Sequence, residues 1–571
     1  MDFLQGGLPP TLEEIISALQ TCRQQQNLHN ARLLHASVCE YGLNAHGAVG
    51  NHLIPMYVDC GGLHEASQIF NTLAVRNEHS WTSLIHGHVL DGNASHALSV
   101  FSQMKEHSVC PSIFTNVAVL KACTRLQRID LGREVHTCIV EDGYDADSFV
   151  GSVLMDMYVK CESLVDAKGV FDDLQGRDVV PWTVLIAGYV DHGLPEEALH
   201  CMDLMESEGV QPNDFTYACS VKACGNLGAL TRGREIHAEI VKIGLETDLF
   251  LCNTLLDMYV RFSTLLDAVE VFDTISSPDI VTWTAIIAGY ADNGLEEEAL
   301  NCFQQMQVNG VTPTAPTFSC CLNACASLGV IAKGYYIHSE IVKRGLDGAF
   351  PNTISAKDSG NGFMSTTVIL KNALIDMYGK CGAMLDVQDV FNRMEIRDSL
   401  TWTSLIMGYA QHGETERVHN LFDKMIEAGM RPDQVTFLTV LTVCSHVGLV
   451  NEGYKYFESM VKDFGVAPSP ELRNCMVDLL CRAGQLHEAV LLLKRSFAQP
   501  SFVTWVMVLD ACHKRGNLEL ARSAFECALN LDDNHSSAYS AMSNILLNTQ
   551  TWDDVASVDV MGAVIQACED L

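Results

Sequence analysis

Short apolar stretches with helical spacing recur along the whole chain, and each ends at glycine or proline. One such unit reads WTVLIAGYV, then a DHGL turn, then PEEALHCMDLMESEGV, and Pro212 closes it. Because apolar residues return every three to four positions on both sides of the turn, we predict two helices joined by a turn over 179–213. The next segments, 214–248 and 249–279, carry the same arrangement.

Tryptophan marks this repetition. Trp81, Trp182, Trp283, Trp402 and Trp505 are separated by 101, 101, 119 and 103 residues. A period of 101 residues is longer than common repeats, so it is expected to contain shorter units, and segments of 35, 35 and 31 residues account for it. The same division predicts fourteen helical hairpins: 12–46, 47–77, 78–112, 113–147, 148–178, 179–213, 214–248, 249–279, 280–314, 315–367, 368–398, 399–433, 434–470 and 471–501.

The longest interval between tryptophans contains 18 additional residues. They lie within GAFPNTISAKDSGNGFMSTT, which is polar and rich in Gly, Ser and Thr. We therefore predict a surface loop inserted between two hairpins at about 348–367.

A hairpin of about 35 residues cannot bury its apolar faces alone, whereas stacked hairpins bury them against their neighbours. The predicted fold is all-α, a right-handed superhelical solenoid of about fourteen helix-turn-helix repeats over 12–501, with an N-terminal extension at 1–11 and a helical tail at 502–571. Tetratricopeptide repeats have a similar length of about 34 residues, but their pattern is not reproduced here in fixed register.

Composition narrows the class of protein further. No apolar run reaches the roughly 18 residues of a membrane span, so no membrane partner is expected. The 22 cysteines include no C-x-x-C, and several share one repeat position, which indicates buried helix faces and reduced thiols: Cys22, Cys123, Cys224, Cys325 and Cys444. No metal site and no cofactor are predicted.

The charge of the chain argues against a general attraction to nucleic acid. The formal net charge is −34, so RNA binding has to rest on local contacts, and DNA is not expected as a partner. The N-terminal sequence MDFLQGGLPPTLEEIISALQ is neither rich in Arg and Ser nor strongly apolar, so it predicts no clear transit or secretory peptide.

Several phrases recur along the chain: WTSLI followed by a Gly-Tyr type ending, FTYACSVKAC at 215, GREVH at 132, GREIH at 233 and NALIDMYGKCG at 372. Together they resemble plant pentatricopeptide repeat proteins of the PLS class, and the resemblance covers about 12–555. It implies that the 35-residue tryptophan unit is the P type, the 35-residue GREIH unit the L type and the 31-residue unit the S type. The segment after 502 resembles the E-type tail of editing factors and departs from it after about Trp552.

The resemblance implies that each P or S repeat binds one base of single-stranded RNA through its fifth and last residues. The pairs are Asn51 with Asn77, Thr82 with Ser112, Ser152 with Asp178, Thr183 with Asn213, Asn253 with Asp279, Thr284 with Thr314, Asn372 with Asp398, and Thr403 with Asp433. With L repeats unread, the family's code predicts 5′-C-N-N-G-A-N-U-R-N-U-G-3′. In a second interpretation, these Asn, Ser, Thr and Asp residues only cap helices.

The implied function is site recognition for C-to-U editing of an organellar transcript, in the mitochondrion or chloroplast, with a deaminase supplied in trans. Deaminating members of the family carry a zinc domain with H-x-E and C-x-x-C. Here His237-Ala-Glu239 and His338-Ser-Glu340 belong to the GREIH phrase, and a structural role is expected for His35, His136, His237 and His338, which share one repeat position. No catalytic residue is predicted, so the chain is not expected to be an enzyme. The alternatives are a helical protein-interaction scaffold and a degenerate paralogue without RNA activity.

Overall fold

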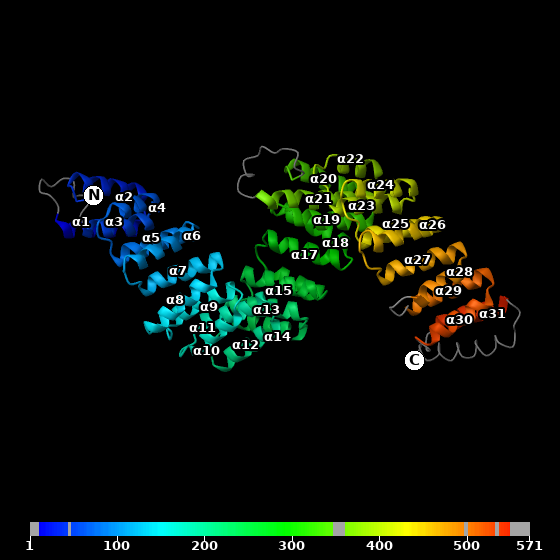
Figure 1. Cartoon of the computed structure of the whole chain (residues 1–571), viewed down its shortest axis with the longest axis horizontal. Helices are drawn as coiled ribbons and strands as arrows, with labels where there is room; N and C mark the ends of the chain where they lie inside the picture. The colour runs from blue at the N-terminus through cyan, green and yellow to red at the C-terminus, as the bar shows by residue number, and fades with distance from the viewer. Residues whose placement is uncertain (1–10, 44–46, 347–359, 496–500, 532–535, 549–571) are drawn as a thin grey trace. The chain divides into compact units, whose positions relative to one another are not determined.

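The computed structural model describes residues 11–43, 47–346, 360–495, 501–531 and 536–548, and the regular structure in these ranges is α-helical (Figure 1). The chain divides into two compact units, 1–278 and 279–571. The first unit contains α1 (Leu12–Gln25), α2 (Leu28–Glu40), α3 (Gly47–Asp59), α4 (Leu63–Thr72), α5 (Glu78–Leu90), α6 (Ala94–Glu106), α7 (Ile113–Leu126), α8 (Ile129–Glu141), α9 (Ser148–Lys160), α10 (Leu164–Asp173), α11 (Val179–Asp191), α12 (Pro195–Ser207), α13 (Asp214–Leu227), α14 (Leu230–Ile243), α15 (Leu249–Arg261) and α16 (Leu265–Thr274).

The second unit continues the same pattern. It contains α17 (Ile280–Asp292), α18 (Glu296–Val308), α19 (Ala315–Leu328), α20 (Ile331–Lys343), α21 (Gly360–Lys380), α22 (Met384–Asn392), α23 (Ser399–Gln411), α24 (Thr415–Glu427), α25 (Gln434–Val447), α26 (Val450–Lys462), α27 (Pro470–Ala483), α28 (Leu486–Arg495), α29 (Phe502–Arg515), α30 (Leu518–Leu529) and α31 (Ser536–Asn548).

Within each unit, the first helix of a hairpin packs against its own second helix and against the first helix of the next hairpin. The odd-numbered helices therefore form a continuous layer in each unit, which we call the first-helix row. This serial packing is that of a solenoid, and the predicted all-α fold is confirmed (Figure 1). The number of repeats stays a prediction.

The predicted hairpin starts coincide with the starts of the odd-numbered helices in the array at all but two places. The first exception is the insertion: α21 begins at Gly360, so 360–367 is helical and the predicted loop is wrong there. The segment 347–359 lies outside the described residues. The second exception is at α27, which Ser469 caps and Pro470 begins, so the predicted boundary between 434–470 and 471–501 moves back by one residue.

The predicted extension and tail are only partly described. Of residues 1–11, only Thr11 is described, as the cap of α1. Residues 502–548 form α29 to α31 wherever they are described, and the divergent segment after 552 lies outside the described residues. The division into these segments therefore stays a prediction.

The repeating tryptophans are packing anchors in this fold. Trp182 is 1% exposed, and its ring meets that of Phe171 edge to face at 4.6 Å. The guanidinium of Arg177 lies 4.6 Å from the centre of the same phenylalanine ring, on which a cation is attracted by the ring's negative face. Phe70 with Trp81 and Phe391 with Trp402 repeat this edge-to-face contact. The cysteines at the shared repeat position are buried as expected, from Cys22 to Cys444.

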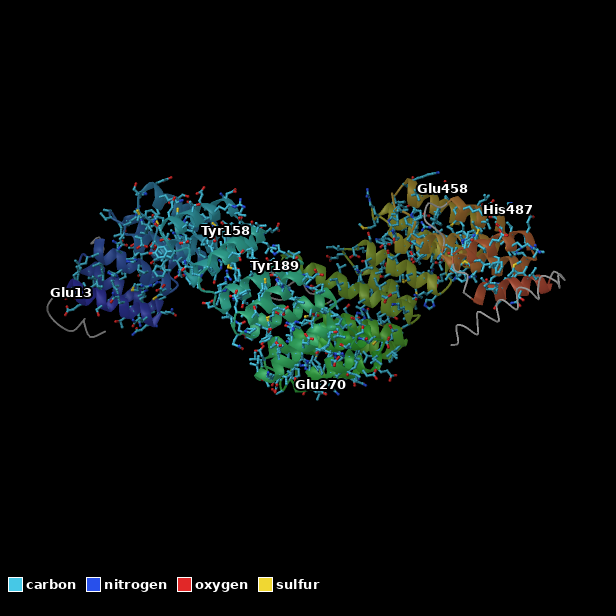
Figure 2. All side chains as sticks on the ribbon, turned by 90° about the horizontal axis from the view of Figure 1, so that it is seen from below. Glu13, Tyr158, Tyr189, Glu270, Glu458 and His487 are labelled. Carbon is cyan, nitrogen blue, oxygen red and sulfur yellow. The ribbon has the colours of Figure 1, made fainter. Side chains whose placement is uncertain are left out.

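A histidine and a tyrosine link consecutive hairpins. Nδ1 of His136 on α8 lies 2.8 Å from the hydroxyl of Tyr158 on α9, which Figure 2 labels. The same bond joins His35 to Tyr57 and His237 to Tyr259 in the first unit, and His338 to Tyr378 in the second. These four histidines therefore have the structural role expected.

This link predicts a loss of stability in mild acid. Burial lowers the pKa of His136 below its ordinary 6.5, so the unfolded chain takes up a proton at a pH where the folded chain does not. The stabilisation is therefore complete above pH 6.5 and is lost as the pH falls below it. We expect the urea midpoint of the native protein to fall from pH 7.5 to 5.5 by more than that of His136→Asn, which keeps an acceptor but does not titrate. An equal fall in both proteins would contradict this account.

Candidate nucleic-acid interface

A groove of about 620 Å³ crosses the first-helix row of the first unit. Its walls come from α1, α3, α5, α7 and α9, and they include three of the predicted RNA-binding residues: Asn51, Asn77 and Thr82. Arg23 and Lys121 also line it, together with the aromatic rings of Phe114 and Phe149. Hydrogen-bonding groups, cations and flat apolar surfaces thus face one groove, which is the combination that single-stranded nucleic acid requires.

The last residue of each predicted pair caps the first helix of the next hairpin. Oδ1 of Asn213 accepts from the backbone N–H of Thr216 at 2.8 Å, and Oδ1 of Asp433 accepts from that of Thr436 at 2.8 Å. Helix capping is therefore a role of these residues, as the second interpretation expected. In the Asn and Asp residues it does not exclude RNA binding, because a cap uses only one of the two polar atoms at the end of their side chains.

A buried hydroxyl joins the two members of most pairs, and it was not apparent from the sequence. It belongs to the third residue of the following helix, as in Thr216, which is completely buried. Thr216 donates to Asn213 Oδ1 at 2.7 Å, and its Oγ1 lies 2.7 Å from Oγ1 of Thr183. Equivalent contacts involve Thr436 with Thr403 and Asp433, Thr401 with Asn372 and Asp398, Ser80 with Asn51 and Asn77, Thr115 with Thr82 and Ser112, and Thr317 with Thr284 and Thr314.

This hydroxyl determines which atoms the pair offers to a ligand. The single proton of Thr183 has two acceptors, the Val179 carbonyl at 2.7 Å and Thr216 Oγ1, and both are inside the protein. Thr183 therefore offers lone pairs outward. Because the helix end uses Oδ1 of Asn213, the group that remains for a ligand is its Nδ2 donor. In Asp433 the remaining group is Oδ2, an acceptor.

The pair Asn372 and Asp398 adds a direct contact. Nδ2 of Asn372 donates to Oδ1 of Asp398 at 3.2 Å, and both side chains accept from Thr401. Burial opposes ionisation of Asp398, but the hydrogen bonds from Thr401 and Asn372 outweigh it and hold its pKa below the ordinary 3.8. The carboxylate is therefore ionised at neutral pH and can accept from a ligand N–H.

One predicted pair lacks this hydroxyl, and the members of another belong to different units. Pro181 occupies the third helical position after Asp178, so no hydroxyl joins Asp178 to Ser152, and Ser152 donates instead to the Ser148 carbonyl at 2.7 Å. Asn253 lies on α15 of the first unit, and Asp279 caps α17 of the second, where its Oδ1 accepts from Thr282.

The segments predicted as L repeats lack the polar arrangement at two described junctions. The third helical residues after their caps are Val150 and Leu251, and their fifth residues include Val117 and Ala218, all buried apolar side chains. This apolar environment provides no base-edge contacts at these two junctions and is consistent with leaving L repeats unread.

A further pair of the same kind was missed. Thr504 is completely buried and donates to Oδ1 of Asn474 at 2.7 Å, while its Oγ1 lies 2.8 Å from that of Ser501. Asn474 is the fifth residue of the hairpin once its start is placed at Pro470. The sequence signal that could have found it is Ser469 followed by proline, which marks a cap and the first turn of a helix.

Exposed apolar side chains stand beside the caps, at the second residue of the first helices. Phe114 is 71% exposed and Phe149 61%, and Phe215 and Phe250 stack in parallel with ring centres 6.1 Å apart. Val180, Val281, Leu400 and Val435 are exposed at the same position. Solvent-exposed apolar surfaces of this kind are platforms on which bases can stack.

Cations on the first-helix row of the first unit alternate with acids. Asp191 lies 3.8 Å from Nζ of Lys160 and 3.1 Å from Nζ of Lys222. Local positive charge is thus present despite a net charge of −34. Pairing with acids limits it, so any attraction for phosphate is short in range.

Neither a membrane-spanning helix nor a metal-binding cluster occurs among the described residues. No helix among them is both long and apolar enough to cross a membrane. In the same residues, no three His, Cys, Asp or Glu side chains converge as metal ligands. Of the two H-x-E phrases, His237 and His338 bond tyrosines, and Glu340 pairs with Lys343 and Arg344.

Comparison with known proteins identifies the repeats. A model of the PPR repeat family matches 177–226, 278–327 and 397–446, and a pentatricopeptide repeat domain model matches 76–125. A further PPR repeat model matches 370–398, 435–463 and 473–496.

The crystal structure of the maize pentatricopeptide repeat protein PPR10 has a TM-score of 0.61 at 17% identity, covering 100% of this chain and 95% of that one. PPR10 in complex with an 18-nt psaJ RNA element has a TM-score of 0.53 at 16% identity, covering 97% and 87%. At these identities the likeness shows the fold.

Two relatives from Arabidopsis thaliana are more similar in sequence. A chloroplastic pentatricopeptide repeat-containing protein is 32% identical over 553 residues, which are 97% of this chain and 61% of that protein. A mitochondrial one is 33% identical over 541 residues, which are 95% of this chain and 76% of that protein. This chain therefore belongs to the pentatricopeptide repeat family.

Proposed function

We propose that this chain is a PLS-type pentatricopeptide repeat protein with an E-type tail that binds one single-stranded RNA sequence, one nucleotide per P or S repeat. The observation that carries this proposal is the fixed polarity of the paired side chains: the fifth residue is held by a buried hydroxyl, and the last residue has one uncommitted polar atom. Helix capping alone requires no hydroxyl link between neighbouring hairpins.

The last residue offers either a hydrogen-bond acceptor or a donor, and the four bases differ in which of the two they require. Guanine and uracil carry an N–H at the centre of the Watson–Crick edge, whereas adenine and cytosine carry a lone pair there. Oδ2 of Asp433 or Asp398 can accept from an N–H, and Nδ2 of Asn213 or Asn77 can donate to a lone pair. Aspartate therefore favours G or U, and asparagine favours A or C.

The fifth residue then separates large bases from small ones. Threonine at Thr183 and Thr403 is shorter than asparagine at Asn51 and Asn372, so it leaves more room for a purine ring. An acceptor or a donor at the last residue, combined with a short or a long side chain at the fifth residue, makes four combinations, one for each base. These combinations support 5′-C-N-N-G-A-N-U-R-N-U-G-3′ as the target. The additional pair Asn474 and Ser501 extends the binding site toward the RNA 3′ end without fixing a base.

The biological setting follows from the relatives. One of these relatives is named as mitochondrial and the other as chloroplastic, and an organelle is the location we propose for this chain. The most specific role we propose is to select a cytidine for C-to-U editing, with a deaminase recruited in trans. In this scheme the repeats of this chain supply the recognition of the RNA, and the partner supplies the deaminase.

A gel-shift titration of the full chain with an 11-nucleotide RNA of the proposed sequence tests the function. Binding should be at least about tenfold tighter than to an RNA of the same composition in scrambled order, since each correct contact contributes roughly 1–3 kcal/mol. Equal affinity for the two RNAs at physiological salt would overturn the proposal and favour a protein-interaction scaffold.

The buried hydroxyl itself is predicted to contribute to selectivity. Thr436→Val removes it while keeping the shape, and Val150 shows that valine fits the equivalent position. Without the hydroxyl, Thr403 and Asp433 lose a common partner, so preference for G over A at their nucleotide should fall about two- to tenfold, the effect of one hydrogen bond. Measured by competition binding, Thr436→Ser should restore the preference, and an unchanged preference in the valine variant would show that the hydroxyl has no such role.

A further inference from the structure

Two predicted P repeats, 78–112 and 280–314, end in a hydroxyl residue rather than in Asp or Asn, and the first of them has an additional polar neighbour. The repeat 78–112 pairs Thr82 with Ser112, and neither an aspartate nor an asparagine is present to distinguish an N–H from a lone pair. The code therefore leaves the second nucleotide of the target undefined. The structure brings another side chain to this place.

Glu78, the first residue of α5, accepts from both members of the pair. Its Oε1 accepts from Thr82 Oγ1 at 2.9 Å and from Ser112 Oγ. The side chain is 29% exposed, and it lines the 620 Å³ groove together with Thr82. Its second oxygen, Oε2, lies 3.3 Å from Nδ1 of His79, whose side chain is 81% exposed.

These contacts give the pair a carboxylate acceptor, the role that Oδ2 of aspartate has in other pairs. The protons of Thr82 and Ser112 are directed to Oε1, so Oε2, which has the exposed His79 as a neighbour, is the oxygen with a lone pair to accept from a base. In the other P repeats the first residue is Val179, Ile280 or Ser399, which carries no carboxylate. This arrangement is therefore particular to 78–112 and replaces the aspartate that the repeat lacks.

We propose that Glu78 is a third specificity-determining residue that makes this repeat select guanine. Threonine at the fifth position leaves room for a purine, and a carboxylate acceptor favours the purine that carries N1–H, as in the pair Thr403 and Asp433. The target becomes 5′-C-G-N-G-A-N-U-R-N-U-G-3′. The inference rests on the proposed function, and it adds a residue from outside the two positions of the code.

The competing role for Glu78 is electrostatic. A carboxylate in the first turn of a helix stabilises the positive end of the helix dipole, and it also repels RNA phosphates. Both effects act on every RNA alike. Discrimination between nucleotides at one site is therefore the measurement that separates the two roles.

The test uses the full chain and four 11-nucleotide RNAs that differ only at the second nucleotide. The native protein should prefer G to A by at least about fivefold, the lower end for one base contact. Glu78→Gln turns the acceptor into a group that can donate, and it should reverse this preference toward A. Glu78→Val, which copies Val179 of a neighbouring P repeat, should remove the preference while leaving binding to the rest of the RNA.

Asp433→Asn is the matched control, because it makes the same chemical change at a pair whose nucleotide is also G. With RNAs that differ only at the last nucleotide, Asp433→Asn should change the preference there from G to A. It should leave the preference at the second nucleotide unchanged. If Asp433→Asn behaves so while Glu78→Gln binds all four RNAs more tightly in equal proportion, Glu78 acts through charge and the inference is wrong. If neither the native protein nor Asp433→Asn discriminates at the last nucleotide, the proposed function itself fails.

Discussion

Replacing Asp398 with asparagine is expected to change the tenth nucleotide of the RNA target from U to C. Thr401 uses Oδ1 of Asp398, so in the proposed complex Oδ2 accepts from the N3–H of uracil, whereas an asparagine Nδ2 would donate to N3 of cytosine. Since a correct base contact is worth roughly 1–3 kcal/mol, preference for U over C should reverse from at least about fivefold in one direction to a similar factor in the other. The measurement is competition binding with two RNAs that differ at this nucleotide.

Asp248→Asn provides the matched control for that experiment. Asp248 caps α15, and its Oδ1 accepts from the backbone N–H of Leu251. It therefore has the same position in its repeat as Asp398, and its replacement removes the same charge. Asp248, however, is the last residue of a predicted L repeat. Asparagine caps helices as well as aspartate does, so both variants should fold. The control should alter affinity for all RNAs equally. A U-to-C change in both variants, or in neither, would contradict the proposal that P and S repeats bind bases and L repeats do not.

The sequence predicts the helices well because their signals are local. Caps such as Asn213 and Asp433, turn glycines and the 3.6-residue apolar spacing all act within one hairpin, and the helix starts follow them closely. The error at the insertion has a local cause as well. Its polar composition predicted a loop, but α21 extends back from the apolar segment to Gly360, so 360–367 is helical despite its composition.

The chemistry of the pairs could be predicted only in part, because it depends on contacts across hairpins. Thr183 and Thr216 are 33 residues apart, and Glu78 and Ser112 are 34 apart. In the sequence, Thr216 and Thr436 look like ordinary first-turn threonines, and Glu78 looks like an ordinary first-turn acid. Only stacking of one hairpin on the next turns these residues into partners of the predicted pairs.

The same contacts distinguish the junctions that follow the predicted P and S repeats from those that follow the predicted L repeats. A hydroxyl at the third helical position, as in Thr401, gives the preceding pair a fixed geometry, while Val150 and Leu251 give none. The Pro181 junction is the informative intermediate case: the pair Ser152 and Asp178 has the right residues without the link. Its selectivity for G should accordingly be weaker than that of Thr403 and Asp433.

The largest effect on stability is expected from Trp182→Ala. The indole of Trp182 is 1% exposed and packs on Phe171, so it connects α10 of one hairpin to α11 of the next. Truncating a fully buried tryptophan costs about 3–5 kcal/mol, through lost burial and the cavity that remains. Because each hairpin of a solenoid is stabilised by its nearest neighbours, the loss should weaken this junction first and divide the cooperative unfolding of the first unit.

Urea denaturation combined with amide hydrogen exchange checks this expectation. Exchange should rise most in α10 and α11 and stay close to native values in α1 to α4, which share no contact with that junction in the first unit. Val165→Ala on α10 is the control, since Val165 is 85% exposed and its truncation should change the unfolding free energy by no more than about 0.5 kcal/mol. A loss below about 1 kcal/mol for Trp182→Ala, or a uniform rise in exchange along the unit, would show that the tryptophans are not the anchors that hold neighbouring hairpins together.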